Sequence, residues 1–134
     1  MTAVGLLCRL YLGTGTKNTG IVGGVNRLLK DAPPGSTPSM YYYYYAAQVM
    51  HHVGGPVWEA WNPKMRDLLI SKQDQGKTKG RPHLKGSWSP AGDVHAGAGG
   101  RLMITSLSIL TLEVYYRHLP LYRRDLGNKA MVSN

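Results

Sequence analysis

Apolar residues recur three and four positions apart along most of the chain, and turn-rich segments interrupt this pattern. Such spacing is typical of helices that bury one face, and no segment shows the alternation that marks a half-buried strand. Clusters of glycine and proline place the helix ends. We therefore predict an all-α fold with about five helices, which cover approximately residues 2–12, 19–32, 40–53, 56–73 and 99–118.

Helix starts are indicated by residues that cap or open helices. Asn18 and Ser39 precede the second and third helices, and their side chains can accept hydrogen bonds from the first backbone N–H groups. Pro56 suits the first turn of the fourth helix. Pro63 lies inside that helix, so we expect a kink or a split with a bend near Asn62.

The fifth helix is apolar nearly all round. From Leu102 to Tyr116 it contains one charged residue, Glu113, which is best interpreted as an ion pair with Arg117 one turn later. A helix with so little polar surface is expected to be surrounded by protein. The long basic loop before it covers residues 74–99, and residues 119–134 form a C-terminal tail whose last residues, 127–134, are expected to fray. A basic cluster belongs to the end of the fifth helix and to this tail (Arg117, His118, Arg123, Arg124).

An internal repeat relates the helices to one another. Thr2-Ala3-x-x-Leu6-Leu7 is similar to Tyr45-Ala46-x-x-Val49-Met50 and to Thr105-Ser106-x-x-Ile109-Leu110. Between them, Val25-Asn26-Arg27-Leu28-Leu29 matches Met65-Arg66-Asp67-Leu68-Leu69. Helices that are apolar on most sides thus alternate with helices that bury only one face. This alternation fits two concentric helical layers, so we predict an α/α toroid or an arc of one.

These residues resemble the terpenoid cyclase and protein prenyltransferase superfamily, most closely the squalene-cyclase-like domains of uncharacterised bacterial proteins. The resemblance covers nearly the whole chain. It is carried by residues 2–9, 44–49, Trp58 with Trp61-Asn62, Met65-Arg66-Asp67 with Gln73, Gly86-Ser87-Trp88, and residues 111–117.

The resemblance implies a structural role for Gln73, Gly86 and Trp88. In that family a glutamine caps a helix end and a tryptophan stacks nearby, in the so-called QW repeat. Here the loop from Asp74 to Lys85 is longer than in the compact repeat. A full toroid has about six helical hairpins, so five helices form an incomplete barrel, and we expect a fragment of a larger toroid.

The catalytic residues of the families that this chain resembles are mostly not matched here. Squalene-type cyclases use an aspartate directly before a Thr-Ala pair, and the matching positions here are Met1, Tyr44 and Ile104, none of which is a strong acid. The zinc ligands of prenyltransferases are not matched by Asp93, His95 and Cys8, so no metal or cofactor is expected. Asp93 and His95 remain weak candidates for a catalytic pair in a solvated, glycine-rich loop.

Other clusters have a simple structural interpretation beside a functional one. Tyr41, Tyr42, Tyr44 and Tyr45 are candidates for the wall of a ligand cavity, since aromatic faces stabilise carbocations, although packing with locally satisfied hydroxyl groups is the favoured explanation. The pair His51-His52 is best interpreted as a helix end. The run Gly97-Ala98-Gly99-Gly100-Arg101 resembles a phosphate cradle, but no strand precedes it, so it is best interpreted as a flexible helix entrance.

Charge and composition limit the functional classes that remain. The formal net charge is +9, and a basic cluster in the loop (Lys77, Lys79, Arg81, Lys85) suggests nucleic acid or an anionic membrane. No aromatic residue interleaves this cluster, so nucleic acid is not expected. Cys8 is the one cysteine, which excludes an intrachain disulfide. We find no signal peptide, and no apolar segment reaches the roughly 20 residues of a transmembrane helix, so the compartment stays open.

Three functions therefore remain. The first is a non-catalytic toroid segment that binds a protein partner or its own copies through an exposed edge of the inner layer. The second is an isoprenoid-binding module or a terpene-cyclase-type enzyme, with the tyrosine cluster as cavity wall. The third is a binder of nucleic acid or of a membrane surface through the basic loop.

Overall fold

The computed structural model describes residues 2–77 and 79–114, and the regular structure in these residues is helical. The α-helices are α1 (Thr2–Tyr11), α2 (Thr19–Asp31), α3 (Met40–Val53), α4 (Gly55–Lys72) and α5 (Ala96–Leu112). A short 3-10 helix, η1 (Pro82–Leu84), interrupts the loop between α4 and α5. The predicted all-α class is confirmed for the described residues, and the bounds of the first four helices agree closely with the prediction.

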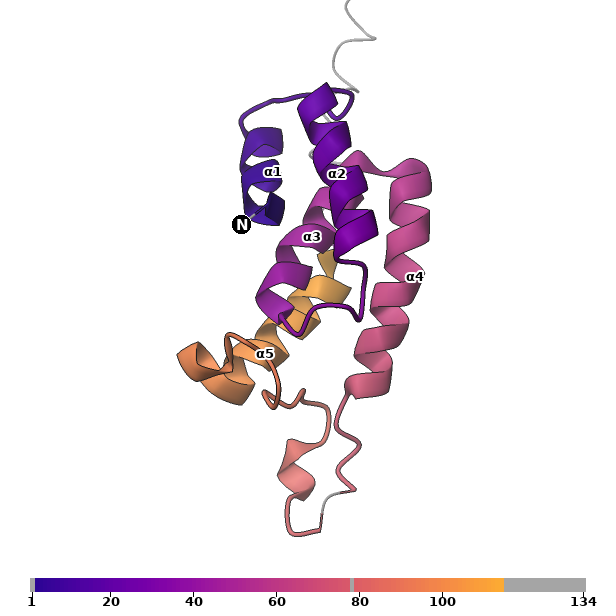
Figure 1. Ribbon diagram of the computed structural model, residues 1–134. Helices are drawn as coiled ribbons and strands as arrows, with labels where there is room; N and C mark the ends of the chain where they lie inside the picture. Colours follow the sequence, from indigo (N-terminus) through magenta and orange to yellow (C-terminus); the bar gives the residue numbers. More distant parts are fainter. Residues whose placement is uncertain (1, 78, 115–134) are drawn as a thin grey trace, which may run out of the picture.

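The helices form two rows around a central helix, α3 (Figure 1). α1 and α5 pack against α3, α2 packs on α1 and α3, and α4 packs on α3 and α5. Figure 1 shows that α1, α3 and α5 run in one direction, while α2 and α4 run in the opposite direction. The alternation of two helix classes along the chain thus corresponds to two rows in space.

Local hydrogen bonds explain where α2 and α3 begin. Asn18 accepts a hydrogen bond from the Gly20 N–H at 2.9 Å, and Ser39 Oγ accepts one from the Tyr42 N–H at 3.1 Å. Each side chain satisfies a backbone donor that has no partner inside its helix. Both predicted caps are therefore confirmed.

The core lies where α3 meets its four neighbours. Ala46 and Ala47 are buried in α3, and such small side chains allow neighbouring helices to approach closely. Around them lie larger buried side chains from the other helices (Leu6, Leu7, Ile21, Val25, Trp61, Met65, Leu69, Ile104). Every described α-helix therefore contributes to one hydrophobic core.

Pro63 does not split α4, which runs unbroken from Gly55 to Lys72 (Figure 1). The expected split was wrong because proline removes a single backbone donor, and the carbonyl of Glu59 that loses its partner lies on the exposed side of the helix. Trp61 and Met65, on the opposite side, are buried and hold the helix against the core on either side of the proline.

The helix α5 differs from the prediction in two respects. Its first turn precedes Gly100, whose φ of 54° and ψ of −147° interrupt the helix at the place where its start was expected. It is also buried on one side only, since Leu102 is 80% exposed and Ile109 is 41% exposed. The expectation that protein surrounds α5 is therefore wrong for the described residues, because apolar composition does not determine whether a neighbouring helix is present.

The expected end of the fifth helix near His118, the ion pair of Glu113 with Arg117, the basic cluster that follows it and the tail at 119–134 lie outside the described residues. No described helix is long and apolar enough to cross a membrane.

Candidate functional site

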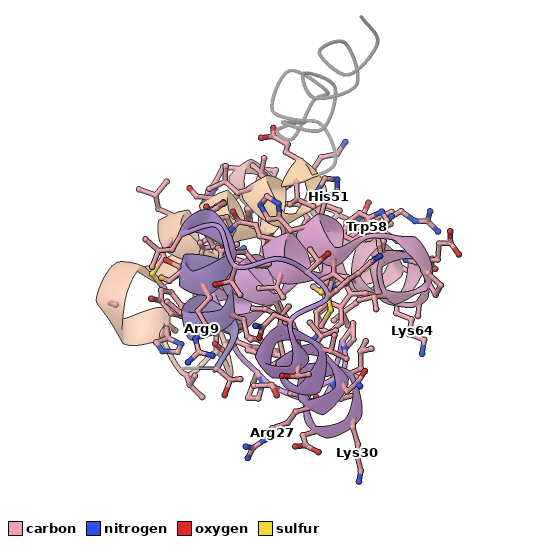
Figure 2. The ribbon with its side chains drawn as sticks, turned by 90° about the horizontal axis from the view of Figure 1, so that it is seen from above. Arg9, Arg27, Lys30, His51, Trp58 and Lys64 are labelled. Atoms are coloured by element: carbon pink, nitrogen blue, oxygen red, sulfur yellow. The ribbon has the colours of Figure 1, made fainter. Side chains whose placement is uncertain are left out.

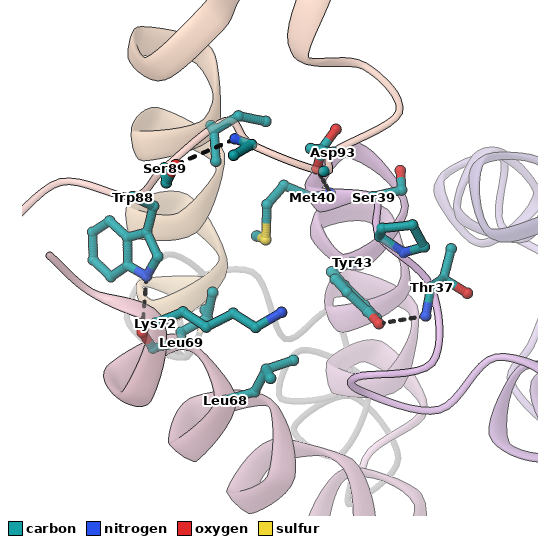
Figure 3. A pocket seen from close by; sticks show the side chains of 14 residues that line it. Thr37, Ser39, Met40, Tyr43, Leu68, Leu69, Lys72, Trp88, Ser89 and Asp93 are labelled. Atoms are coloured by element: carbon teal, nitrogen blue, oxygen red, sulfur yellow. Dashed lines mark hydrogen bonds between the residues drawn. The ribbon is translucent and has the colours of Figure 1, made fainter.

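A cavity of about 400 Å³ opens where the start of α3, the end of α4, α5 and residues 88–93 meet (Figure 3). Most of its wall is apolar, with the side chains of Met40, Tyr43, Leu68, Leu69, Trp88 and Ile104. Two charged residues, Lys72 and Asp93, also line it. The cavity thus lies between the two rows of helices, at one end of the molecule.

Trp88 and Gln73 come together at the edge of this cavity. They form an isolated antiparallel bridge, and the side-chain amide of Gln73 donates to the Gly86 carbonyl at 3.1 Å. The indole N–H of Trp88 donates to the carbonyl of Leu69 at 2.8 Å. Because that carbonyl lies in the last turn of α4, the indole satisfies an acceptor that the helix leaves unpaired. Gln73, Gly86 and Trp88 thus close the base of the basic loop.

A second set of contacts holds the same loop to α5. Arg101 donates to Ser87 Oγ at 2.8 Å and lies 3.6 Å from a carboxylate oxygen of Asp74. Both partners of this ion pair are largely buried, with 29% and 18% of their side chains exposed. The backbone N–H of Trp88 also donates to Thr105 Oγ1 at 3.1 Å. Arg101, expected at a flexible entrance, instead fixes the start of α5 to the loop base.

Asp93 and His95 lie in the loop before α5, and both contact the start of α3. One carboxylate oxygen of Asp93 accepts from the Met40 N–H at 2.7 Å, and the other accepts from the His95 N–H at 2.8 Å. Nδ1 of His95 lies 3.1 Å from Ser39 Oγ. A carboxylate stabilises the positive end of a helix, so this geometry gives Asp93 a capping role at α3.

The tyrosines of α3 point to several sides of the helix. Tyr43, which was not among the sequence candidates, is buried and accepts hydrogen bonds from two backbone N–H groups of the preceding loop at 2.8 and 3.0 Å. Tyr42 donates to the Ala32 carbonyl at 2.8 Å, and burial, with a smaller effect of Tyr43, raises the pKa of Tyr42 above its ordinary value. Both hydroxyl groups therefore bind the α2–α3 loop.

The other candidate tyrosines form a ring cluster. The rings of Tyr41 and Tyr45 lie 4.8 Å apart, those of Tyr44 and Tyr45 lie 5.0 Å apart, and Tyr41 also stacks on His95 at 5.2 Å. A hydrogen bond with Tyr41, with burial as a further cause, raises the pKa of Tyr45. Tyr41 and Tyr42 line a smaller cavity of about 190 Å³ beside α1, whereas Tyr43 lines the larger one.

The two histidines lie in the last turn of α3, where the sequence places a helix end. His51 packs edge to face on Trp58 at 5.0 Å, and His52 packs on Tyr11 at 5.4 Å. Figure 2 shows His51 beside Trp58, and it shows the cations of α2 and α4 (Arg27, Lys30, Lys64) pointing away from the core. These contacts give the histidines a packing role.

The basic cluster lies on the loop between α4 and α5. Its members Lys77, Lys79, Arg81 and Lys85 are exposed. The segment from 75 to 92 contains no acidic residue. The only tryptophan of this segment, Trp88, is buried and thus not exposed for stacking on a base.

A metal site is not found in the described part of the chain, since no group of three or more His, Cys, Asp or Glu side chains comes together there. Cys8 is exposed on α1, far along the sequence from Asp93 and His95. Comparison of the chain with family models, with curated proteins and with solved structures found no match.

Proposed function

We propose that the chain is an arc of a squalene-cyclase-like α/α toroid and works as a non-catalytic association module, in which copies bind end to end through the row formed by α1, α3 and α5. The parallel direction of these helices and the antiparallel second row of α2 and α4 support the toroid arc. The proposal contains no catalytic step, because the positions of the initiating acid in the family it resembles hold Met1, Tyr44 and Ile104.

The exposed side of α5 carries the proposal. Ile104, Ser108 and Thr111 are buried on the side that faces the core, and Leu102 and Ile109 are exposed on the opposite side. Exposed apolar side chains that share one face of a helix mark surfaces of association more often than isolated ones do. The described residues of this face include one charged side chain, Glu113.

The exposed side of α1, at the other end of the row, is complementary to this face. It presents two small residues, Gly5 and Cys8, against which larger side chains of α5 can pack. Because Thr2 is equivalent to Thr105 in the repeat, a parallel α1 from a second copy places Arg9 about level with Glu113. The α5–α1 contact between copies would then repeat the α3–α5 contact within one copy.

Sedimentation velocity of the full chain over a range of concentrations tests the proposal. We expect concentration-dependent self-association, which Ile109→Glu weakens by about tenfold or more because it places an unpaired carboxylate in the contact. Val22→Glu is the matched control, since Val22 is 44% exposed on α2, in the other row. A well-folded chain that stays monomeric at high concentration, or an equal effect of both variants, would overturn the proposal.

The predicted charge pair provides a second test. Arg9→Glu and Glu113→Arg should each weaken the association, and the double variant should restore it. Failure of the double variant to recover, with both single variants folded, contradicts the proposed register of the two helices.

A further inference from the structure

We infer that the cavity between the two rows binds a small amphipathic carboxylate, with its aliphatic chain among the apolar side chains and its head group on Lys72. This inference concerns a different surface from the α5 edge and does not depend on self-association. The volume of about 400 Å³ falls in the range of about 300–1,000 Å³ that is typical of small-molecule sites.

The wall of the cavity suits an aliphatic chain. Leu68 and Leu69 come from α4, Ile104 from α5 and Met40 from α3, so apolar side chains from three helices converge on one space. Trp88 closes one side, and its indole N–H is already bonded to Leu69. Removal of apolar surface from water favours binding, so such a chain is attracted without any specific polar contact.

Lys72 supplies the charge. Figure 3 shows its side chain extending along Leu68 and Leu69, with the amino group toward Tyr43. The acid on the same wall, Asp93, forms no ion pair with Lys72, and its two carboxylate oxygens instead accept backbone hydrogen bonds at 2.7 and 2.8 Å. Among the described residues Lys72 forms no ion pair, so its charge is available to a ligand.

The charges of the wall disfavour a head group with several negative charges. Lys72 is the one cation among the described residues that line the cavity, and Asp93 adds a negative charge nearby. A diphosphate carries several negative charges and requires several cations, whereas a carboxylate requires one. The geometry therefore favours a fatty-acid-like ligand over a prenyl diphosphate.

Isothermal titration calorimetry of the full chain with decanoate, decanol and decylamine tests this inference. We expect decanoate to bind more tightly than decanol, and decylamine to bind least. Lys72→Met keeps the aliphatic stem and removes the charge, so it should weaken decanoate binding by about tenfold and leave decanol binding unchanged. Lys64→Met, at an exposed position of the same helix outside the cavity wall, is the matched control and should leave both unchanged.

Two further results bear on the position of the ligand. Ala91 is exposed at the rim of the cavity, so Ala91→Trp should block the space and abolish decanoate binding while the urea midpoint stays the same. Prenyl diphosphate should bind less tightly than decanoate. The inference is overturned if decanoate does not bind the folded chain at millimolar concentration, if Lys72→Met binds it as tightly as the wild type, or if the diphosphate is the preferred ligand.

Discussion

Trp88→Phe should destabilise the fold more than Trp61→Phe, although both indoles are buried, with 5% and 0% of the residue exposed. The difference lies in their ring nitrogens. The Trp88 indole donates to the Leu69 carbonyl at 2.8 Å, whereas the Trp61 indole has no hydrogen-bond partner among the described residues. The two substitutions therefore remove similar apolar surface, but only one of them removes a hydrogen bond.

The size of the effect follows from the place of the Leu69 carbonyl. In a continuing helix it would accept from the N–H of Gln73, but that N–H bonds to the Ile70 carbonyl at 3.3 Å instead. Trp88→Phe thus leaves a carbonyl in the last turn of α4 without its partner, which costs about 1–3 kcal/mol. Trp61→Phe removes an unpaired donor, which offsets part of its loss of packing. We expect a difference in the free energy of unfolding of about 1–3 kcal/mol.

Urea unfolding followed by circular dichroism at 222 nm measures this difference, since fluorescence would change with the number of tryptophans. The dependence of the free energy on urea should stay the same in both variants, because the fold is retained. An equal loss of stability in the two variants, or a larger loss in Trp61→Phe, would refute the argument that Trp88 acts through its hydrogen bond to α4.

Three further predictions concern single side chains. Gly23→Ala should raise the free energy of unfolding in urea by about 0.5–1 kcal/mol through helix propensity, whereas Gly24→Ala should not, since its Cβ would lie 2.6 Å from Leu6 Cδ2; an equal gain in stability from both variants would contradict this contact. Tyr43→Phe should cost about 1–3 kcal/mol because two backbone donors lose their acceptor, and a neutral effect in thermal unfolding would contradict it. The raised pKa of Tyr42 means that the unfolded chain loses this proton first, so stability is full below about pH 10 and falls as the pH rises further. Tyr42→Phe should reduce that fall in urea midpoints measured from pH 9 to 11, and an unchanged fall would contradict the assignment.

Local signals in the sequence predict most of the helix bounds. Asn18 and Ser39 act within three residues of their own position, so their capping role can be recognised without knowing the tertiary structure. The same holds for the ends of α1 and α3, where Gly13 and Gly54 have positive φ values of 92° and 71°. The split predicted at Pro63 was wrong because the effect of a proline depends on whether packing holds the surrounding helix in place.

The candidate site depends on contacts between distant residues, so the sequence predicts less of it. Asp93 caps α3 across 53 residues, and no local pattern announces that contact. The cavity at Lys72 was not predicted, since none of the four tyrosines expected in a cavity wall lines it. Its signal exists, however: Leu68 and Leu69 are four and three residues before Lys72 and so share one side of α4. The exposure of Leu102 and Ile109 could not be predicted either, because composition records how apolar a helix is and not what covers it.

The helix α5 contributes to both proposed surfaces, but with opposite sides. Ile104 lines the cavity and is buried on the core side, whereas Ile109 is exposed on the opposite side. Arg101 and Thr105 hold the loop base, and with it Trp88, in place from the same helix. Substitutions at the outer face of α5 therefore leave the wall of the cavity unchanged.

The two activities should accordingly respond to different variants. Ile109→Glu should weaken self-association in sedimentation by about tenfold or more and leave the affinity for decanoate within about twofold of the wild type, because effects at separated sites are nearly additive. Lys72→Met should weaken decanoate binding by about tenfold and leave self-association unchanged. If Ile109→Glu also weakened decanoate binding by tenfold in a chain with unchanged stability, the cavity would have to be completed by the second copy, and the carboxylate site would belong to the interface between copies.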